Sequence, residues 1–215
     1  MEAYLDNSAT TRVDAQVQEL MKKLMDVDFG NPSSRHQKGV VAEGYIKEAR
    51  QKIAATLKVD PKELIITSGG TESNNMALIG TALAAKRKGN HIITTAVEHP
   101  SVKATASFLE EQGFRITFLS VDSRGQISLE DLKEALTPDT ILVSIMYVNN
   151  EIGTIQPVEE AAKLVHATVP GAVFHVDAIQ AYGKVMIRPK QQGIDLLSVS
   201  SHKFHGPKGA GFLYC

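Results

Sequence analysis

One lysine lies in a context that favours chemistry over solvation. In "SVSSHKFHGPKGAGFLYC", residues 198–215, Lys203 lies between two histidines and shortly before a Gly-Pro-Lys-Gly turn. Most lysines are solvated surface charges, but this one follows an apolar run that is typical of a buried strand. An amine held at the end of such a strand is suited to forming a Schiff base with a carbonyl compound. Lys203 is therefore the first candidate for a catalytic residue.

A pair of glycines in "TSGGTESNN", residues 67–75, suggests a second function. Glycines between a strand and the start of a helix leave the backbone amides accessible, because glycine has no side chain to cover them. Together with the helix dipole and the Thr71 hydroxyl, the amides next to Gly70 would form an anion cradle. The segment is neither a P-loop nor a G-x-G-x-x-G motif. An ordinary tight turn with Thr71 as the helix cap is the alternative interpretation.

Asp177 follows the apolar run "AVFHV". A carboxylate buried there needs a cation, because an unpaired buried charge costs several kcal/mol. A heterocyclic cation would meet this need, and the alternative is an N-cap for a helix that starts at Ala178. An anion cradle, an acid and an amine are together the three parts of a pyridoxal phosphate site.

Histidines allow two further interpretations. His99 follows another apolar run and would lie against an aromatic ring or move a proton, unless it is a loop histidine satisfied by backbone. The pairs His175-x-Asp177 and His202-x-x-His205 suggest a metal ion. Neither pair supplies a full ligand set at a recognised spacing, so we expect no metal site.

The elements that must position these residues alternate along the chain. Amphipathic patterns cover residues 16–25 and 41–57, and further helices are expected near Glu72, Ser101, Ser128 and Val158. Apolar runs occupy residues 63–67, 91–97, 115–121, 140–148, 172–176, 195–200 and 209–215. This alternation predicts an α/β fold with a mainly parallel seven-stranded sheet flanked by helices. The glycines around 206–211 indicate a tight return, so the last strand is expected to run antiparallel.

Ligands of open α/β sheets bind beyond the carboxyl ends of the strands. Polar groups follow five of the predicted strands: Ser68 to Thr71, Glu98 and His99, Asn149 and Asn150, Asp177 with Gln180, and Ser201 to Lys203. These groups are scattered over some 130 residues of the sequence. Because they all follow strands, we expect them to meet at one edge of the sheet and form a site.

The bulk composition is that of a soluble globular protein. The chain has 215 residues, 43% of them hydrophobic and 22% charged, and a formal net charge of −1. This charge gives no reason to expect nucleic acid or an anionic membrane as a partner. We find no signal peptide and no membrane span, and we expect a cytoplasmic protein. Cys215 cannot form an internal disulfide, and nothing nearby in sequence would activate it as a nucleophile.

In these residues and in the motifs around them, the chain resembles the cysteine desulfurases, which are class V pyridoxal phosphate enzymes with the aspartate-aminotransferase type fold. The resemblance runs over essentially the whole chain. The matching motifs occur in the order "YLDNSATT", "FGNPSS", "TSGGTESNN", "VEHPSV", "ILVSIMYVNNEIGTIQP", "FHVDAIQAYGK" and "SSHKFHGPKGAGFLY".

The resemblance implies a role for each matching residue. Lys203 would hold pyridoxal 5'-phosphate covalently and later move protons at the substrate carbons. Asp177 would pair with the pyridine nitrogen and His99 would stack on the ring. The remaining implied roles are a hydrogen bond to the ring hydroxyl from Gln180, phosphate binding by Gly70, Thr71, Ser200 and His202, and positioning of the substrate carboxylate by Asn150.

The resemblance also implies a domain division, a reaction and partners. Residues 1–14 would be an N-terminal arm that normally joins a small C-terminal domain, and residues 15–215 would be the large cofactor-binding domain. The substrate would be L-cysteine, and its sulfur would pass through an enzyme persulfide to an acceptor or iron–sulfur scaffold protein, leaving alanine.

The persulfide-forming cysteine and a carboxylate-binding arginine normally lie beyond the lysine, outside these 215 residues. We therefore expect the chain alone to be inactive and to form a homodimer or to associate with a C-terminal half. The alternatives are a related lyase or transaminase with the same cofactor, and a non-catalytic fragment that binds the cofactor or only dimerises.

Overall fold

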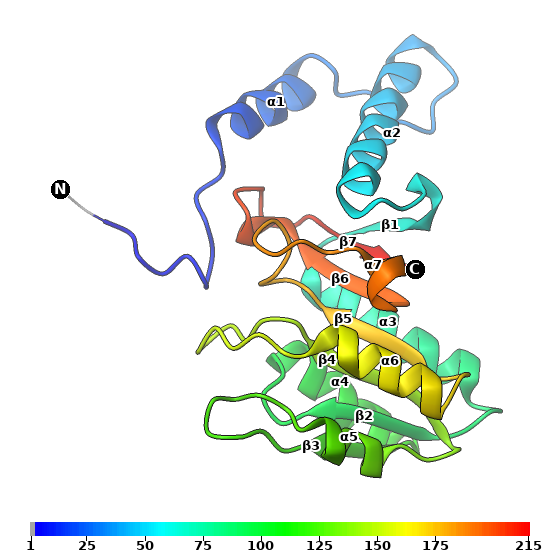
Figure 1. The fold of residues 1–215 in the computed structure, drawn as a ribbon. Helices are drawn as coiled ribbons and strands as arrows, with labels where there is room; N and C mark the ends of the chain where they lie inside the picture. Colours follow the sequence, from blue (N-terminus) through cyan, green and yellow to red (C-terminus); the bar gives the residue numbers. More distant parts are fainter. Residues whose placement is uncertain (1–2) are drawn as a thin grey trace.

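The computed structural model describes residues 3–215, and in this range one seven-stranded sheet organises the chain (Figure 1). The strands are β1 (Leu64–Thr67), β2 (His91–Thr95), β3 (Arg115–Leu119), β4 (Thr140–Met146), β5 (Val173–Asp177), β6 (Leu196–Ser200) and β7 (Gly211–Tyr214). Their order is β1-β7-β6-β5-β4-β2-β3. The five strands from β6 to β3 in this order pair in parallel, and β7 runs antiparallel to both β6 and β1. The predicted sheet and its antiparallel last strand are both confirmed.

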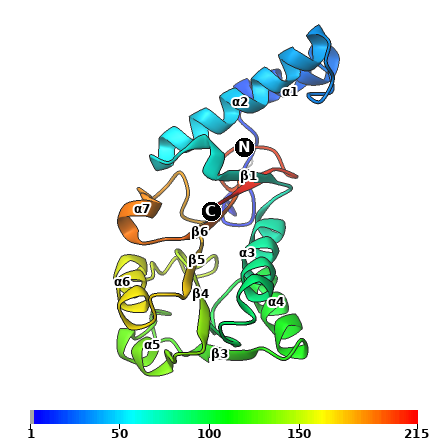
Figure 2. The ribbon, with the colours of Figure 1, turned by 90° about the vertical axis from the view of Figure 1, so that its right-hand side faces the viewer.

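Helices cover both faces of the sheet. They are α1 (Ala15–Asp26), α2 (Gln37–Leu57), α3 (Gly70–Ala85), α4 (Pro100–Glu111), α5 (Leu129–Ala135), α6 (Val158–Thr168) and α7 (Pro189–Gln192). Helices α3 and α4 lie on one face, and α5, α6 and α7 lie on the other (Figure 2). Each face has its own apolar cluster, one that contains Leu78 and Leu109 and a larger one that contains Val165 and Phe174. The two-layer burial explains why the inner strands are apolar on both sides.

The helix starts follow from local chemistry. The Ser128 side chain accepts a hydrogen bond from the Asp131 amide at 3.1 Å, which caps α5. Helix α4 begins with Pro100, whose missing N–H costs nothing in the first turn, and His99 is its N-cap. Helix α3 begins at Gly70, two residues before the start expected near Glu72.

Helix α1 and most of α2 stand away from the sheet, beyond β1 (Figure 1), whereas the C-terminal end of α2 packs on the larger cluster through Ala54 and Leu57. None of the described residues of α1 is buried. Large apolar side chains are exposed on these helices and the segment between them: Leu20, Met25, Val27, Phe29, Val40 and Ile46. Between residues 3 and 215, no helix combines the length and the apolar character that crossing a membrane requires.

The segment before α1 lies against the turn that follows β6. Thr11 donates from its amide and its hydroxyl to the carbonyl of His202, at 2.8 and 2.9 Å. The Asp14 amide donates to the carbonyl of His205 at 2.9 Å. These bonds join the two ends of the chain. The division into an arm of residues 1–14 and a domain of residues 15–215 stays a prediction.

The central core can be tested with a matched pair of aromatic residues. Phe174 on β5 is fully buried, whereas Phe108 on α4 is 43% exposed. We expect Phe174→Ala to lower the free energy of unfolding by about 3–5 kcal/mol, because it leaves a cavity. Phe108→Ala should change it by less than about 1 kcal/mol. Urea denaturation measures both, and equal losses would contradict the placement of the core.

Candidate active site

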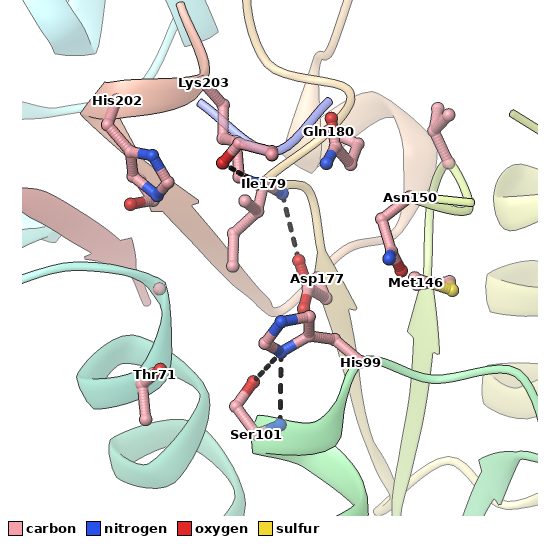
Figure 3. Close-up of a pocket in the computed structure, with 14 residues that line it drawn as sticks. Thr71, His99, Ser101, Met146, Asn150, Asp177, Ile179, Gln180, His202 and Lys203 are labelled. Atoms are coloured by element: carbon pink, nitrogen blue, oxygen red, sulfur yellow. Dashed lines mark hydrogen bonds between the residues drawn. The ribbon is translucent and has the colours of Figure 1, made fainter. Parts of the chain in front are cut away.

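A pocket of about 270 Å³ opens where the carboxyl ends of β2, β4, β5 and β6 meet the start of α3 (Figure 3). The structure brings to it every residue for which the sequence predicts a cofactor or substrate contact: Gly70, Thr71, His99, Asn150, Asp177, Gln180, Ser200, His202 and Lys203. Five further residues line the pocket without a role predicted from the sequence: Ala9, Ser101, Met146, Val148 and Ile179. The predicted meeting of strand ends is therefore found, and the individual roles stay predictions.

The glycine turn after β1 brings backbone close to three other elements. Gly69 has a φ of +148°, a conformation that favours glycine. A Cβ on Gly70 would collide with Cδ1 of Ile179, and a Cβ on Gly211 would lie 2.8 Å from the Gly69 Cα. Gly69 has no side chain to bind the first amides of α3, and Gly70 and Thr71 line the pocket. The alternative of Thr71 as the helix cap is wrong, because Gly69 occupies the N-cap position.

Asp177 is buried and is held by two neutral donors. Its Oδ1 accepts from the Ile179 amide at 3.0 Å, and its Oδ2 accepts from Asn74 Nδ2 at 2.8 Å. Burial raises the pKa of the carboxyl, while these two hydrogen bonds act against that rise. No helix follows, because residues 178–181 form a turn, so the N-cap interpretation is wrong. A ring N–H⁺ placed in the pocket would meet the requirement of this buried acid.

Lys203 projects toward the N-terminal segment. Its Nζ donates to the carbonyls of Ser8 and Ala9, at 2.5 and 2.8 Å. Burial and the nearby charge of Lys184 lower the pKa of the amine, and Asp177 acts in the opposite direction. A lowered pKa increases the fraction of neutral amine, which is the form that can attack a carbonyl.

His99 is connected to Asp177 through two residues that the sequence analysis did not single out. Asn74, fully buried on α3, donates from Nδ2 to Asp177 Oδ2 and, at 3.0 Å, to Ser101 Oγ. Ser101 Oγ in turn lies 2.8 Å from His99 Nδ1. The Ser101 amide also donates to this nitrogen at 3.1 Å. Helical spacing could have pointed to Asn74 as a pocket residue, because Asn74 follows Gly70 by four residues and so lies on the same face of α3.

Glu98 and Asn149 support the pocket from behind. Glu98 Oε1 accepts from Thr95 Oγ1 and from the Met146 amide, both at 2.8 Å. Its Oε2 has no partner within residues 3–215, and burial raises the pKa of the carboxyl to about 8. Asn149 donates to the carbonyl of Val97 at 3.1 Å and does not line the pocket. Glu98 thus ties the segment before His99 to the end of β4 as a neutral acid.

The histidine pairs suggested by the sequence do not converge on a metal. His175 uses both ring nitrogens within the sheet, with Ser144 Oγ at 2.8 Å and Ser198 Oγ at 2.9 Å. Burial lowers the pKa of His175 to about 3. In the part of the chain from residue 3 to 215, no three His, Cys, Asp or Glu residues gather in a way that would hold a metal ion. Cys215 is exposed and lines a different hollow, on α3 and β7.

The donor set fits a ligand with three chemical features. Open amides and the hydroxyls of Thr71 and Ser200 suit an anionic group. The buried carboxylate of Asp177 suits a protonated ring nitrogen, and the Lys203 amine suits a carbonyl carbon. Pyridoxal phosphate combines these three features in one molecule.

Comparisons with known proteins point in the same direction. The family model described as Aminotransferase class-V matches residues 3–215. The cysteine desulfurase IscS of Dictyoglomus turgidum is 51% identical over 213 residues, which are 99% of this chain and 54% of that protein. The chain thus spans about half the length of the curated relatives it matches.

Two solved structures share the fold at high similarity. A NifS-like protein superimposes with a TM-score of 0.97 and 43% identity, over 100% of this chain and 59% of the other. SspA in complex with cysteine superimposes with a TM-score of 0.95 and 41% identity, over 99% of this chain and 61% of the other.

The buried acid behind the pocket predicts a pH-dependent stability. The pKa of the Glu98 carboxyl rises from an ordinary value of 4.5 to about 8 in the folded state, because the group is buried. Between these pH values Glu98 binds more protons in the folded chain than in the unfolded one, so its contribution to stability falls as the pH rises. The slope is at most about 1.4 kcal/mol per pH unit.

We expect Glu98→Gln to remove this slope, because glutamine keeps the accepting Oε1 and cannot ionise. Urea denaturation at several pH values measures the difference between variant and wild type. That difference should grow in favour of the variant as the pH rises toward 8. Glu110→Gln, which removes a charge from the exposed surface of α4, is the matched control. Parallel pH profiles for wild type and Glu98→Gln would contradict the neutral buried acid.

Proposed function

The chain belongs to the aminotransferase class-V family, and from this membership we propose that it is the cofactor-binding part of a pyridoxal phosphate-dependent cysteine desulfurase. The observation that carries the proposal is the convergence of the Asp177 carboxylate, the Lys203 amine and the glycine turn at Gly70 on one pocket. Identity of 51% to a cysteine desulfurase supports the choice of reaction.

We assign the pocket residues to the parts of the cofactor as follows. Asp177 would bind the ring nitrogen, and Lys203 would hold the cofactor through its amine. The Gly70 amide, Thr71, Ser200 and His202 would bind the phosphate. A second hollow, which also contains Gly69 and Lys208, adjoins the pocket at these four phosphate-binding residues. Gln180 would bind the ring hydroxyl, His99 would lie against the ring, and Asn150 would receive the substrate carboxylate.

When bound, pyridoxal phosphate withdraws electrons from the bonds around the substrate carbon that carries the amino group. The chain's own residues then bind, orient and move protons. Asp177, as a buried anion, would keep a proton on the ring nitrogen. Lys203 would give and take protons at the substrate carbons, a task that its lowered pKa favours.

The sulfur step requires a thiol that is not in this pocket. In the proposed reaction, L-cysteine and an enzyme thiol give alanine and an enzyme persulfide. Cys215 lines a separate hollow with Ile65 and Leu213. We therefore propose that the attacking thiol comes from outside these 215 residues, and that the persulfide sulfur passes to an acceptor or iron–sulfur scaffold protein.

Association is also part of the proposal. The exposed apolar side chains on α1, α2 and the segment between them, such as Met25 and Phe29, would be covered by a second copy or by the remaining half of the enzyme. In this arrangement residues 1–14 would act as an arm toward a small domain and residues 15–215 as the large domain.

The cofactor assignment is tested by the visible absorption spectrum of the purified chain after addition of pyridoxal phosphate. We expect wild type to show a protein-bound band and Lys203→Ala to lack it, because the variant has no amine at this position. Lys163→Ala, which removes an exposed lysine paired with Glu159, should keep the band. A band of equal strength in all three proteins would contradict the assignment of Lys203.

The reaction is tested separately with L-cysteine. Alanine should form only after a second polypeptide supplies a thiol, for example the C-terminal half of the Dictyoglomus turgidum relative. Alanine formation by the chain alone at an equal rate would contradict an external thiol. A product other than alanine would favour a related lyase or transaminase.

A further inference from the structure

Asn74 and Ser101 form a continuous hydrogen-bonded path between Asp177 and His99, and each step of the path has a determined direction. We infer that these two residues are positioning residues that hold His99 as the neutral tautomer with its proton on Nε2. The tautomer follows from this chain's own contacts. Its consequence for catalysis rests on the proposed function.

The direction is fixed at the His99 end by backbone. A peptide N–H can only donate, and the Ser101 amide lies 3.1 Å from His99 Nδ1. His99 is the N-cap of α4, so this bond also satisfies one of the open amides of the first turn. Nδ1 must therefore offer its lone pair, and in a neutral ring the proton is then on Nε2.

The direction is fixed at the other end by Asp177. Its Oδ1 receives the Ile179 amide, and its Oδ2 lies 2.8 Å from Asn74 Nδ2, a group with two hydrogens and no acceptor. Rotating the Asn74 amide by half a turn would place its oxygen against the carboxylate. It would also leave buried N–H groups without partners, at a cost of about 1–3 kcal/mol. In the observed orientation, Oδ1 is the one atom of the Asn74 amide group that lacks a partner within residues 3–215.

The middle of the path follows from its two ends. The second hydrogen of Asn74 Nδ2 points to Ser101 Oγ at 3.0 Å, so this oxygen accepts. The single hydroxyl proton of Ser101 is then free to be donated to His99 Nδ1 at 2.8 Å. Nδ1 thus receives two donors, one from the Ser101 backbone and one from its side chain. In Figure 3 both bonds end on the same ring nitrogen, and the other nitrogen points away from Ser101 into the pocket.

A second contact between α3 and α4 lies beside the path. Thr105, one turn beyond Ser101 on α4, donates to the side-chain oxygen of Asn75 on α3. Its hydroxyl also lies 2.8 Å from the Ser101 carbonyl. Asn75 thus joins α3 to α4 through Thr105, and it has no hydrogen bond to the Ser101 hydroxyl or to the His99 ring. Asn75 is therefore a neighbour of Asn74 that shares its helix and its residue type but not its function.

The consequence is that His99 presents a hydrogen-bond donor to the pocket. If the pocket takes the cofactor and substrate as proposed, Nε2 can give a proton or a hydrogen bond there, and it has no free lone pair with which to accept one. Asp177 would then act twice, on the ring nitrogen directly and on the His99 tautomer through Asn74 and Ser101.

The test is a long-range ¹H–¹⁵N correlation spectrum of the histidine rings in the ¹⁵N-labelled chain without added cofactor. His99→Asn identifies the His99 signals. We expect wild type to show an unprotonated Nδ1 and a protonated Nε2. Ser101→Ala and Asn74→Leu should each move both nitrogen shifts part of the way toward the average of the two tautomers, because the Ser101 amide still donates to Nδ1. Ser101→Thr, which retains the hydroxyl, should resemble wild type, and so should Asn75→Leu.

A double variant shows whether Asn74 acts on His99 through Ser101 or whether the two residues act on it independently. Because Asn74 acts through Ser101, adding Asn74→Leu to Ser101→Ala should move the His99 shifts no further. A proton on Nδ1 in wild type, unchanged shifts in both single variants, or additive shifts in the double variant would each overturn the inference. Failure of the proposed function would instead appear in the absorption experiment, which does not depend on the tautomer.

Discussion

The carboxylate of Asp177 is buried at the end of the central strand β5, and much of the site is arranged so that this charge is not left unpaired. Helix α3 supplies Asn74, the turn after β5 supplies the Ile179 amide, and both donate to it. Placing Asn74 there requires α3 to lie across the sheet. The glycine turn that starts α3 is therefore brought to the same pocket by the same packing. One buried charge thus links the anion cradle, the acid and the histidine.

The surrounding ionisable groups are kept uncharged by the same burial. Glu98, with a pKa of about 8, and His175, with a pKa of about 3, are both neutral near pH 7. Burial acts in opposite directions on an acid and a base because it always disfavours the charged form. Asp177 differs from Glu98 in having a donor on each carboxylate oxygen. These two hydrogen bonds act against the rise that burial causes in the pKa of Asp177.

The sequence predicts the sheet and the pocket lining well because both depend on simple regularities. Apolar runs mark the strands, and parallel strands bring their carboxyl ends to one edge. It does not predict the supporting contacts. Asn74 lies inside a helix, away from any strand end. Glu98 does follow a predicted strand, but its residue type does not show that it is buried behind the pocket and does not line it. The carbonyls of Ser8 and Ala9, which bind Lys203, belong to the backbone and leave no signal in residue type.

The position of β7 has a consequence for how the chain is made. β1 pairs only with β7 within residues 3–215, in a register that joins Leu64 to Tyr214 and Thr67 to Gly211. The strand that leaves the ribosome first therefore enters the sheet last, after almost 150 further residues have been synthesised. Until then its edge and that of β6 are unpaired, and unpaired edges invite association with other chains. The glycine turn lies against Gly211 of β7 as well as against Ser200, so the anion cradle gains this neighbour only when β7 is in place.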